Sequence, residues 1–291
     1  MLIIHSPRCL EYGAAGHPES PERVRSAVAL LHKDFHTWIA PEPCSEEDIL
    51  RVHSPALLEA VKSGNFVDAD TPVFPNIYEL ARLSAGGAIL AAQRALPNQP
   101  AFSLMRPPGH HAERNRVMGF CYLNNIAIAV ARILQTGIGK VVILDFDCHH
   151  GNGTEQIFHG DPRVLFVSLH QSPCYPGTGL VSRGNCLNYQ LQPGTGPSDF
   201  LAAFDDALDK IRAFKPGMLA VSAGFDAYKD DPITHMELEI DTYHNIGRRL
   251  AGLCRPSGHS SGLPGFAALE GGYSREVARC VEAFVNGWEQ G

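Results

Sequence analysis

Carboxylates and imidazoles occur at a spacing that could hold a metal ion. The segment DFDCHHGNG at 145–153 contains Asp147 and His149, and a further carboxylate, Asp226, directly follows another apolar run. Two carboxylates and one imidazole suit zinc or Fe(II), and three protein ligands leave positions open for water and substrate. An isolated Asp-x-His is more often a hydrogen-bonded pair in a loop. The additional carboxylate favours a catalytic metal site at Asp147, His149 and Asp226.

Groups that transfer protons or stabilise charge follow other apolar runs. His110 and His111 come after a stiff Pro-Pro-Gly turn, and imidazole titrates near neutral pH, which suits acid–base catalysis. Tyr273 ends the Gly-Gly-Tyr turn at 271–273, where a phenol can donate a hydrogen bond to a developing oxyanion. By themselves, adjacent histidines are usually a surface pair, and such a turn usually carries a packed tyrosine. Beside a metal site, both features predict catalytic roles.

Short apolar runs alternate with helical patterns, which predicts βαβ units around a mostly parallel sheet. The expected strands are Leu2–His5, Ala101–Met105, Lys140–Phe146, Arg163–Leu169, Met218–Ala223 and Gly265–Leu269. The expected helices are one capped by Ser20, then Glu46–Val52, Ser54–Lys62, Tyr78–Ala95, Asn124–Gln135, Ser198–Ala213, Glu237–Leu253 and Arg275–Trp288. Five strands lead directly into polar side chains, one of them His170. Because open α/β sheets bind ligands at the carboxyl ends of their strands, we expect one composite active site there.

Composition narrows the class of protein. The chain has 291 residues, with 24 Lys and Arg against 31 Asp and Glu, and the resulting charge of −7 argues against binding to nucleic acid or an anionic membrane. We find no apolar run of ~18 residues and no signal-peptide pattern, and therefore expect no membrane span. The eight cysteines form no Cys-x-x-Cys pair, which predicts reduced, mostly buried thiols in a cytoplasmic protein. Without an obvious linker, we expect a single catalytic domain over residues 1–291.

Seven successive segments resemble the signatures of the histone deacetylase family. They are RPPGHHA (106–112), GFCYLNN (119–125), LDFDCHHGNGTE (144–155), SLH (168–170), YPGTG (175–179), SAGFDA (222–227) and EGGY (270–273). Asn152 stands where class I members carry Asp, so the chain is more similar to class II and bacterial deacetylase-like amidohydrolases. The resemblance implies the α/β arginase/deacetylase fold, with an eight-stranded parallel sheet between helical layers.

The resemblance also implies how the catalytic groups divide their work. Zinc, with Fe(II) as an alternative, would act as a Lewis acid on an amide carbonyl and lower the pKa of bound water, and Tyr273 would help to hold the oxyanion. His110 would pair with Asp145, whose carboxylate favours the imidazolium. His111 would face the neutral Asn152. We therefore expect His111 to act as the general base and later as the acid, with the two histidines able to share these roles.

Other residues match the family's substrate tunnel, which takes an N-acyl amine, usually ε-acetyl-lysine on a protein or peptide. Tyr175 stands where the tunnel wall usually has Phe, and Gly119 matches the residue whose carbonyl accepts from the substrate amide. Arg23 matches a basic residue near the inner end of the pocket. The substrate-binding residues implied in this way are Gly119, Phe120, Tyr175, Ile233 and Gly271.

Two potassium sites are implied by the same resemblance. The inner site would use Asp145, the Ser168 hydroxyl and the backbone carbonyls of Asp147, His149 and Leu169. The outer site would use Phe158, Asp161 and Val164.

Three other functions compete with an acyl-lysine deacetylase. An arginase-like ureohydrolase needs a second Asp at the later strand, which Asp226-Ala227-Tyr228 lacks. Acetylpolyamine amidohydrolases place a carboxylate at the tunnel mouth. In one subgroup this carboxylate is a Glu at the position that Ile233 occupies in this chain, and an aliphatic residue there favours acyl-lysine. Asp68 and Asp70 could still supply such an acid, so acetylpolyamines and small acylated metabolites stay open. A non-catalytic acyl-lysine binder would have lost a catalytic residue, and none is lost.

Overall fold

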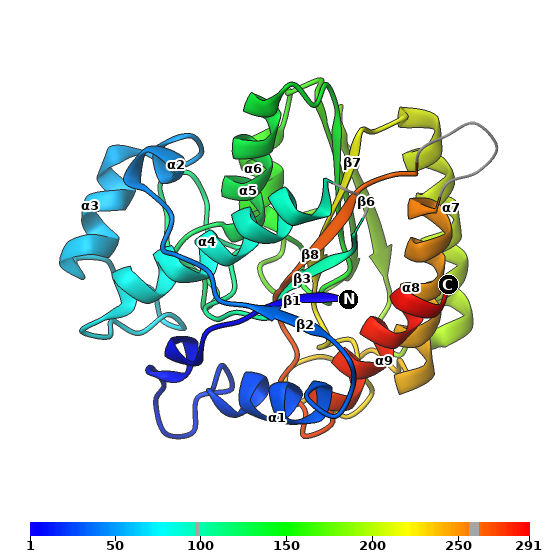
Figure 1. Ribbon diagram of the computed structural model, residues 1–291, viewed down its shortest axis with the longest axis horizontal. Coiled ribbons are helices and arrows are strands. Elements are labelled where there is room, and N and C mark those ends of the chain that lie inside the picture. The colour runs from blue at the N-terminus through cyan, green and yellow to red at the C-terminus, as the bar shows by residue number, and fades with distance from the viewer. Residues whose placement is uncertain (97–98, 256–261) are drawn as a thin grey trace.

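Eight parallel strands form one sheet through the centre of the molecule (Figure 1). The computed structural model describes residues 1–96, 99–255 and 262–291. The strands are β1 (Leu2–Ile4), β2 (Thr37–Ile39), β3 (Ala101–Ser103), β4 (Val141–Asp145), β5 (Val164–Gln171), β6 (Cys186–Leu191), β7 (Met218–Ala223) and β8 (Gly265–Leu269). Their order is β2-β1-β3-β8-β7-β4-β5-β6, and every pairing is parallel. All the carboxyl ends therefore meet at one edge of the sheet.

Helices cover both faces of this sheet. They are α1 (Glu22–Leu31), α2 (Glu46–Leu50), α3 (Pro55–Ser63), α4 (Ile77–Ala95), α5 (Asn125–Ile133), α6 (Asn152–Phe158), α7 (Pro197–Phe214), α8 (Ile240–Cys254) and α9 (Val277–Gln290), with short 3-10 turns at Pro7–Leu10 and Leu134–Thr136. Figure 1 shows α1, α7, α8 and α9 on one side of the sheet and α3, α4 and α5 on the other. The expected fold, a parallel sheet between helical layers, is confirmed.

Alternate residues of the central strands supply the two hydrophobic cores. On β4, Val142 and Leu144 are buried in the core that contains α1, α7, α8 and α9. Val141 and Ile143, between them in sequence, are buried in the core that contains α3, α4 and α5. Successive side chains of a strand point to opposite faces, so a strand covered on both sides is apolar at every position. This packing holds the carboxyl ends of the central strands in fixed positions.

The structure matches six of the eight strands to expected ones and adds two at the edges of the sheet. The added strands are β2 and β6, whose residues are largely half-exposed or exposed, so neither has the apolar run by which the others were identified. The helix α6 was also not expected. The first helix has Pro21 rather than Ser20 at its N-cap, and α8 begins at Ile240, three residues after the expected start at Glu237.

Two further expectations concern the chain as a whole. Within the described ranges, no helix combines the length and apolarity needed to cross a membrane. All eight cysteines are free thiols, and six of them are buried.

Candidate active site

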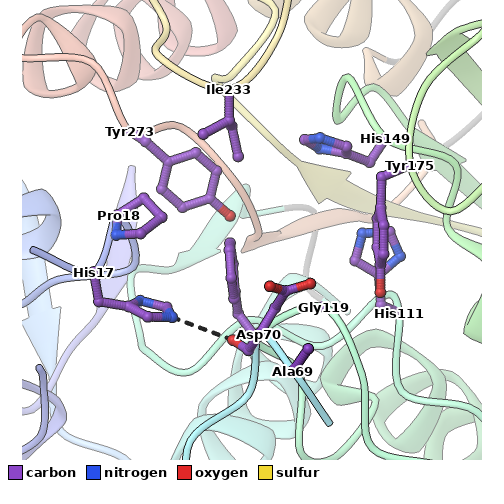
Figure 2. Close-up of a pocket in the computed structure, with 11 residues that line it drawn as sticks. His17, Pro18, Ala69, Asp70, His111, Gly119, His149, Tyr175, Ile233 and Tyr273 are labelled. Atoms are coloured by element: carbon purple, nitrogen blue, oxygen red, sulfur yellow. Dashed lines mark hydrogen bonds between the residues drawn. The ribbon is translucent and has the colours of Figure 1, made fainter.

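A cavity of about 370 Å³ opens at the carboxyl ends of the strands. Figure 2 shows residues from several loops facing one another across it. Its lining consists of His17, Pro18, Ala69, Asp70, His111, Gly119, Phe120, His149, Tyr175, Ile233 and Tyr273. Seven of these residues were expected from the sequence to take part in catalysis, metal binding or substrate binding. Four others, at 17–18 and 69–70, come from two loops near the N-terminus.

The three expected metal ligands lie together at the inner end of the cavity. Asp147, His149 and Asp226 are buried, and their candidate ligand atoms all lie within 4.8 Å of one another. His149 Nδ1 is 2.8 Å from Asp226 Oδ2 and 3.1 Å from Asp147 Oδ1. Two ligand atoms on one tetrahedral zinc, each bound at about 2.0–2.2 Å, are separated by roughly 3–3.5 Å. The donor set therefore fits a small divalent cation with only slight adjustment.

The loop after β4, rather than the strand itself, brings these groups together. β4 ends at Asp145, so alternation along a strand does not explain why Asp147 and His149 converge. Instead, the His149 N–H donates to Asp147 Oδ1 at 2.9 Å, and the Gly271 N–H donates to Asp147 Oδ2 at 2.7 Å. A Cβ on Gly271 would lie 2.5 Å from the carboxylates of both Asp147 and Asp226. Glycine is required at that position because the ligand carboxylates approach its backbone closely.

The charge of the cluster also favours a cation. Burial and the nearby Asp147 carboxylate raise the pKa of Asp226. Burial opposes protonation of His149, but the Asp226 and Asp147 carboxylates raise its pKa well above the ordinary value. Without a metal ion, the two carboxylates thus retain a proton nearby. A divalent cation would supply the same compensation, and metal ligands must lose their protons to bind it.

His110 lies behind the cavity beside a buried carboxylate. Its Nδ1 donates to Asp145 Oδ2 at 3.0 Å. Burial lowers the pKa of His110, but the carboxylates of Asp147 and Asp145 outweigh burial and raise it to about 10. The backbone N–H of His110 donates to Glu270 Oε2 at 3.0 Å, which fixes the chain next to the imidazole. In the metal-free protein, the neighbouring carboxylates therefore favour the imidazolium form of His110.

His111 has the opposite electrostatic character. Its Nδ1 donates to Asn152 Oδ1 at 2.7 Å, and Asn152 is the first residue of α6. The Asn152 Nδ2 donates in turn to Glu113 Oε1 at 2.8 Å, which orients the amide with its oxygen towards the imidazole. Burial, followed by the positive charges of His110 and His149, lowers the pKa of His111 well below its ordinary value. His111 is therefore neutral near pH 7, and its Nε2 can accept a proton.

Tyr273 lies across the cavity from His111, with its hydroxyl directed into the cavity (Figure 2). The Arg23 guanidinium lies 4.6 Å from the centre of the Tyr273 ring and donates to the Gly272 carbonyl at 2.6 Å. Phe120 contacts the same ring edge-to-face, with centroids 5.7 Å apart. Burial raises the pKa of Tyr273 well above its ordinary value, so the phenol keeps its proton and can donate it in a hydrogen bond.

Four of the five substrate-binding residues expected from the sequence line the cavity, namely Gly119, Phe120, Tyr175 and Ile233, whereas Gly271 is not among the lining residues. Tyr175 is 39% exposed, and its ring meets the His111 ring edge-on at 5.1 Å. Gly119 has a φ of 58°, and a Cβ on it would lie 2.5 Å from the His111 ring, so the turn beside Phe120 needs glycine. The Gly119 carbonyl accepts the Cys121 thiol at 3.3 Å. Ile233 lies across the cavity from this turn (Figure 2).

Several buried charged residues support the site but were given no role from the sequence. Glu19 accepts hydrogen bonds from Arg106 Nε at 2.6 Å and from Arg23 Nη1 at 2.9 Å. Glu270 holds the backbone beside His110, and Asp231 accepts the backbone N–H of Tyr273 at 2.7 Å. Except for the one between Glu19 and Arg23, these contacts join residues far apart in the chain, so no local pattern in the sequence indicated the role.

The residues expected at the inner and at the outer potassium site have different surroundings in the structure. Asp145 and Ser168 lie opposite each other on β4 and β5, both fully buried, which fits the expected inner site. The expected outer ligands, the carbonyls of Phe158, Asp161 and Val164, instead accept hydrogen bonds from the side chain of Asn185.

His170 is not part of the cavity, although its strand points towards the site. Its Nδ1 lies 2.9 Å from the Ser168 hydroxyl, and its ring packs against His150 with centroids 4.7 Å apart. Of the five predicted polar strand ends, four lie around the metal ligands. The fifth, which ends at His170, packs against His150 outside the cavity lining.

A parallel sheet with buried Asp147, His149 and Asp226 at its carboxyl edge gives the molecule the arginase/deacetylase fold. The structure of an acetylpolyamine aminohydrolase from Burkholderia pseudomallei has the same fold, with a TM-score of 0.90 and 27% sequence identity over 99% of this chain and 98% of that one. The histone deacetylase domain model matches residues 17–288. The chain belongs to the histone deacetylase family.

Two sequence relatives support the same assignment. A probable deacetylase from Methanothermobacter thermautotrophicus is 39% identical over 99% of this chain and 90% of its own length. A histone deacetylase-like amidohydrolase from Pseudomonas aeruginosa is 38% identical over 90% of this chain and 73% of its own length. The family and these relatives are those of deacetylases and amidohydrolases, so the protein is a hydrolase of this type.

Proposed function

We propose that the protein is a zinc-dependent amidohydrolase that removes acetyl or other acyl groups from N-acylated amines, with ε-N-acyl-lysine as its main substrate class. The observation that carries this proposal is the meeting of three kinds of group in one cavity. The buried ligand set, through His149, the neutral imidazole of His111 and the phenol of Tyr273 all face the same cavity. The metal would be held by Asp147, His149 and Asp226.

A divalent cation bound there supplies a Lewis acid for the acyl carbonyl and the attacking water. Neutral His111 takes the proton of that water on Nε2, because its Nδ1 proton is engaged by Asn152. His110, hydrogen-bonded to Asp145, would contribute positive charge from behind the cavity, and the Tyr273 hydroxyl donates a hydrogen bond to the developing oxyanion. His111 then returns the proton to the leaving amine.

The walls of the cavity suit a linear acylated chain. Phe120 and Tyr175 provide aromatic rings, Ile233 provides an aliphatic wall, and Gly119 lines the same cavity with a carbonyl that could accept the substrate amide N–H. Apolar walls bury the methylene groups of a lysine side chain at ~0.8 kcal/mol for each one. This lining supports acyl-lysine over a polycationic chain.

We further propose a potassium ion at the inner site. Its ligands would be the Asp145 carboxylate, the Ser168 hydroxyl and the backbone carbonyls of Asp147, His149 and Leu169. The matched positions of Asp145 and Ser168 on adjacent strands support this site. The free cysteines support a reducing compartment, and we propose the cytoplasm.

Release of the free carboxylate, which is acetate from acetylated substrates, together with the free amine tests the proposed reaction directly. The protein, stripped of metal and reloaded with Zn²⁺ or Fe²⁺, is incubated with an acetyl-lysine peptide, with longer acyl-lysine peptides and with acetylpolyamines. We expect metal-dependent turnover, fastest on acyl-lysine. A metal-loaded protein that binds an acyl-lysine peptide without hydrolysing any member of the panel would be a binding protein, and the proposal would be wrong.

An acetylpolyamine substrate is the second candidate, because a carboxylate stands at the mouth of the cavity. Asp70 is exposed and lines the opening (Figure 2). A cationic polyamine chain that entered the cavity would pass this carboxylate. The structural neighbour from Burkholderia pseudomallei is described as an acetylpolyamine aminohydrolase.

The variant Asp70→Asn separates the two substrates. If polyamines are the substrate, KM for an acetylpolyamine should rise several-fold while kcat stays near the wild-type value. Asp68→Asn is the matched control, because Asp68 already accepts the Thr71 hydroxyl at 2.7 Å and lies outside the cavity lining. Equal and small effects of both variants on polyamine turnover would remove the second candidate.

A further inference from the structure

Three backbone carbonyls between α6 and β5 converge on one side-chain amide. The Asn185 Nδ2 lies 2.8 Å from the carbonyl oxygen of Phe158, 3.2 Å from that of Asp161 and 2.8 Å from that of Val164. Carbonyl dipoles that point at one another concentrate partial negative charge, which must be balanced by a cation or by hydrogen-bond donors. In this chain an NH₂ group with two protons meets all three oxygens.

The orientation of the amide is set by a fourth hydrogen bond. The Gly160 N–H donates to Asn185 Oδ1 at 2.7 Å. Turning the amide over would place its oxygen among the three carbonyl oxygens and its NH₂ group against the Gly160 N–H. Both changes replace attraction by repulsion, so the amide is held in one orientation, although the Phe158 and Asp161 carbonyls also accept backbone N–H groups.

We propose that the Asn185 carboxamide occupies the place of a monovalent cation, so that this cage binds no potassium ion in the native protein. The three carbonyls belong to Phe158, Asp161 and Val164, the residues that the family resemblance places at an outer potassium site. An ion and the amide nitrogen would need the same oxygen atoms and the same space. The proposal does not depend on the reaction that the enzyme catalyses.

The amide also has a structural consequence that a free ion would not have. Asn185 directly precedes the edge strand β6, and its own carbonyl accepts the Phe166 N–H at 2.9 Å. The side chain therefore ties the start of β6 by hydrogen bonds to the segment that joins α6 and β5. Because α6 begins at Asn152, the hydrogen-bond partner of His111, this tie supports one end of the catalytic machinery without requiring potassium.

The variant Asn185→Asp tests the exchange of amide for cation. Its carboxylate would still accept the Gly160 N–H, but its second oxygen would face three carbonyl oxygens, and a bound cation or protonation of the carboxylate must compensate that arrangement. The melting temperature is measured in KCl and in N-methyl-D-glucamine chloride at equal ionic strength. We expect potassium to stabilise the variant by on the order of 5 °C more than it stabilises the wild type.

The wild-type protein is the baseline because any contribution from the inner site is common to both proteins. Asn188→Ala is the matched control: Asn188 lies in β6 and its Nδ2 donates to Glu155 Oε2 at 2.8 Å, without a carbonyl cage. Its melting temperature should fall equally in both salts. If Asn185→Asp does not fold, Asn185→Ala leaves the cage open and serves in its place.

Crystals soaked in a thallous salt locate the ion, because Tl⁺ replaces potassium and scatters anomalously. We expect a Tl⁺ peak among the three carbonyls in the Asn185 variant and none there in the wild type. A peak at this cage in the wild type would overturn the proposal. The absence of a peak from the variant would overturn it equally, since the amide would then not be standing in for a cation. If the melting temperatures and the Tl⁺ peaks disagree, the presence or absence of the Tl⁺ peak decides whether the amide stands in for a cation.

Discussion

The carboxylate of Asp231 connects Tyr273 with Ile233. Its Oδ2 accepts the backbone N–H of Tyr273 at 2.7 Å, and its Oδ1 accepts that of Ile233 at 3.1 Å. Asp231 is buried, so these two hydrogen bonds to a carboxylate are shielded from competing water. One side chain therefore sets the position of the proposed oxyanion donor relative to a wall of the cavity.

Replacing Asp231 by Asn should slow catalysis without loss of metal. The amide oxygen can accept only one of the two N–H groups, and the NH₂ group then faces the other donor. A shift of about 1 Å in a catalytic group can cost ~10²-fold in rate, and we expect kcat to fall by roughly 10- to 100-fold. Steady-state kinetics together with zinc stoichiometry measure this effect.

A double-mutant cycle shows whether Asp231 acts through Tyr273. When Tyr273→Phe is already present, Asp231→Asn should have little further effect on kcat, because the hydroxyl that it positions is gone. Asp230→Asn is the control, since Asp230 is the exposed neighbour. Full additivity of the two losses would contradict a positioning role.

Asp226→Ala should abolish activity and most metal binding, because only three protein ligands are proposed. The Asp226 carboxylate also accepts the Cys148 N–H at 2.8 Å, so the alanine variant has a second reason to be less stable. Asp226→Asn keeps an acceptor for that N–H and removes the charge. Metal analysis of both folded variants should show strongly reduced zinc, and stoichiometric zinc in either would refute the ligand assignment.

Tyr273→Phe should reduce kcat by ~10²–10³-fold, the usual effect of losing one oxyanion donor. The ring contacts with Phe120 and Arg23 do not involve the hydroxyl, so the fold and the metal site should be unaffected. Hydroxamates should still bind the metal, though more weakly. Tyr175→Phe removes a hydroxyl from the opposite wall and should change kcat only a few-fold. An unchanged kcat in Tyr273→Phe would exclude this residue from the mechanism.

The inner strands and the metal ligands could be predicted from the sequence because each has a local signal. A strand buried on both faces is an unbroken apolar run, and β4 or β7 can be recognised from a few residues. The ligands follow these runs directly. The edge strand β6 has only one fully buried residue, Cys186, so its sequence resembles a loop.

The supporting residues could not be predicted because their roles depend on long-range contacts. Helix α6 was not expected since it contains Asn152 and Gly153, both poor helix formers. Asn185 contacts three carbonyls of a separate segment, whose residues the family resemblance places at a potassium site. Nothing in the local sequence indicates that the Asn185 amide would donate to these carbonyls in place of a potassium ion.

At the active site, Asn152, the hydrogen-bond partner of His111, stands where class I members of the family carry Asp. Asn152 accepts from His111 with its oxygen and donates to Glu113 with its nitrogen. Replacing Asn152 by Asp alone would place two carboxylates at the present 2.8 Å separation of Nδ2 and Oε1. Such a pair shares a proton, which would weaken the effect on the imidazole. The variant Asn152→Asp is therefore best combined with Glu113→Gln, whose amide can donate to the new carboxylate.

An ionised Asp at position 152 should raise the pKa of His111, because the negative charge favours the imidazolium. Protonated His111 cannot accept the proton of the attacking water. The acidic limb of the kcat/KM profile, which reports the essential base of the free enzyme, should therefore move to higher pH. The double variant is compared with Glu113→Gln alone, in the same metal form, because metal and histidine titrate as a coupled system. A limb that stays in place or moves to lower pH would show that His111 is not the titrating base. A shift to higher pH would assign that role to His111 rather than to His110, whose charge is already fixed by Asp145.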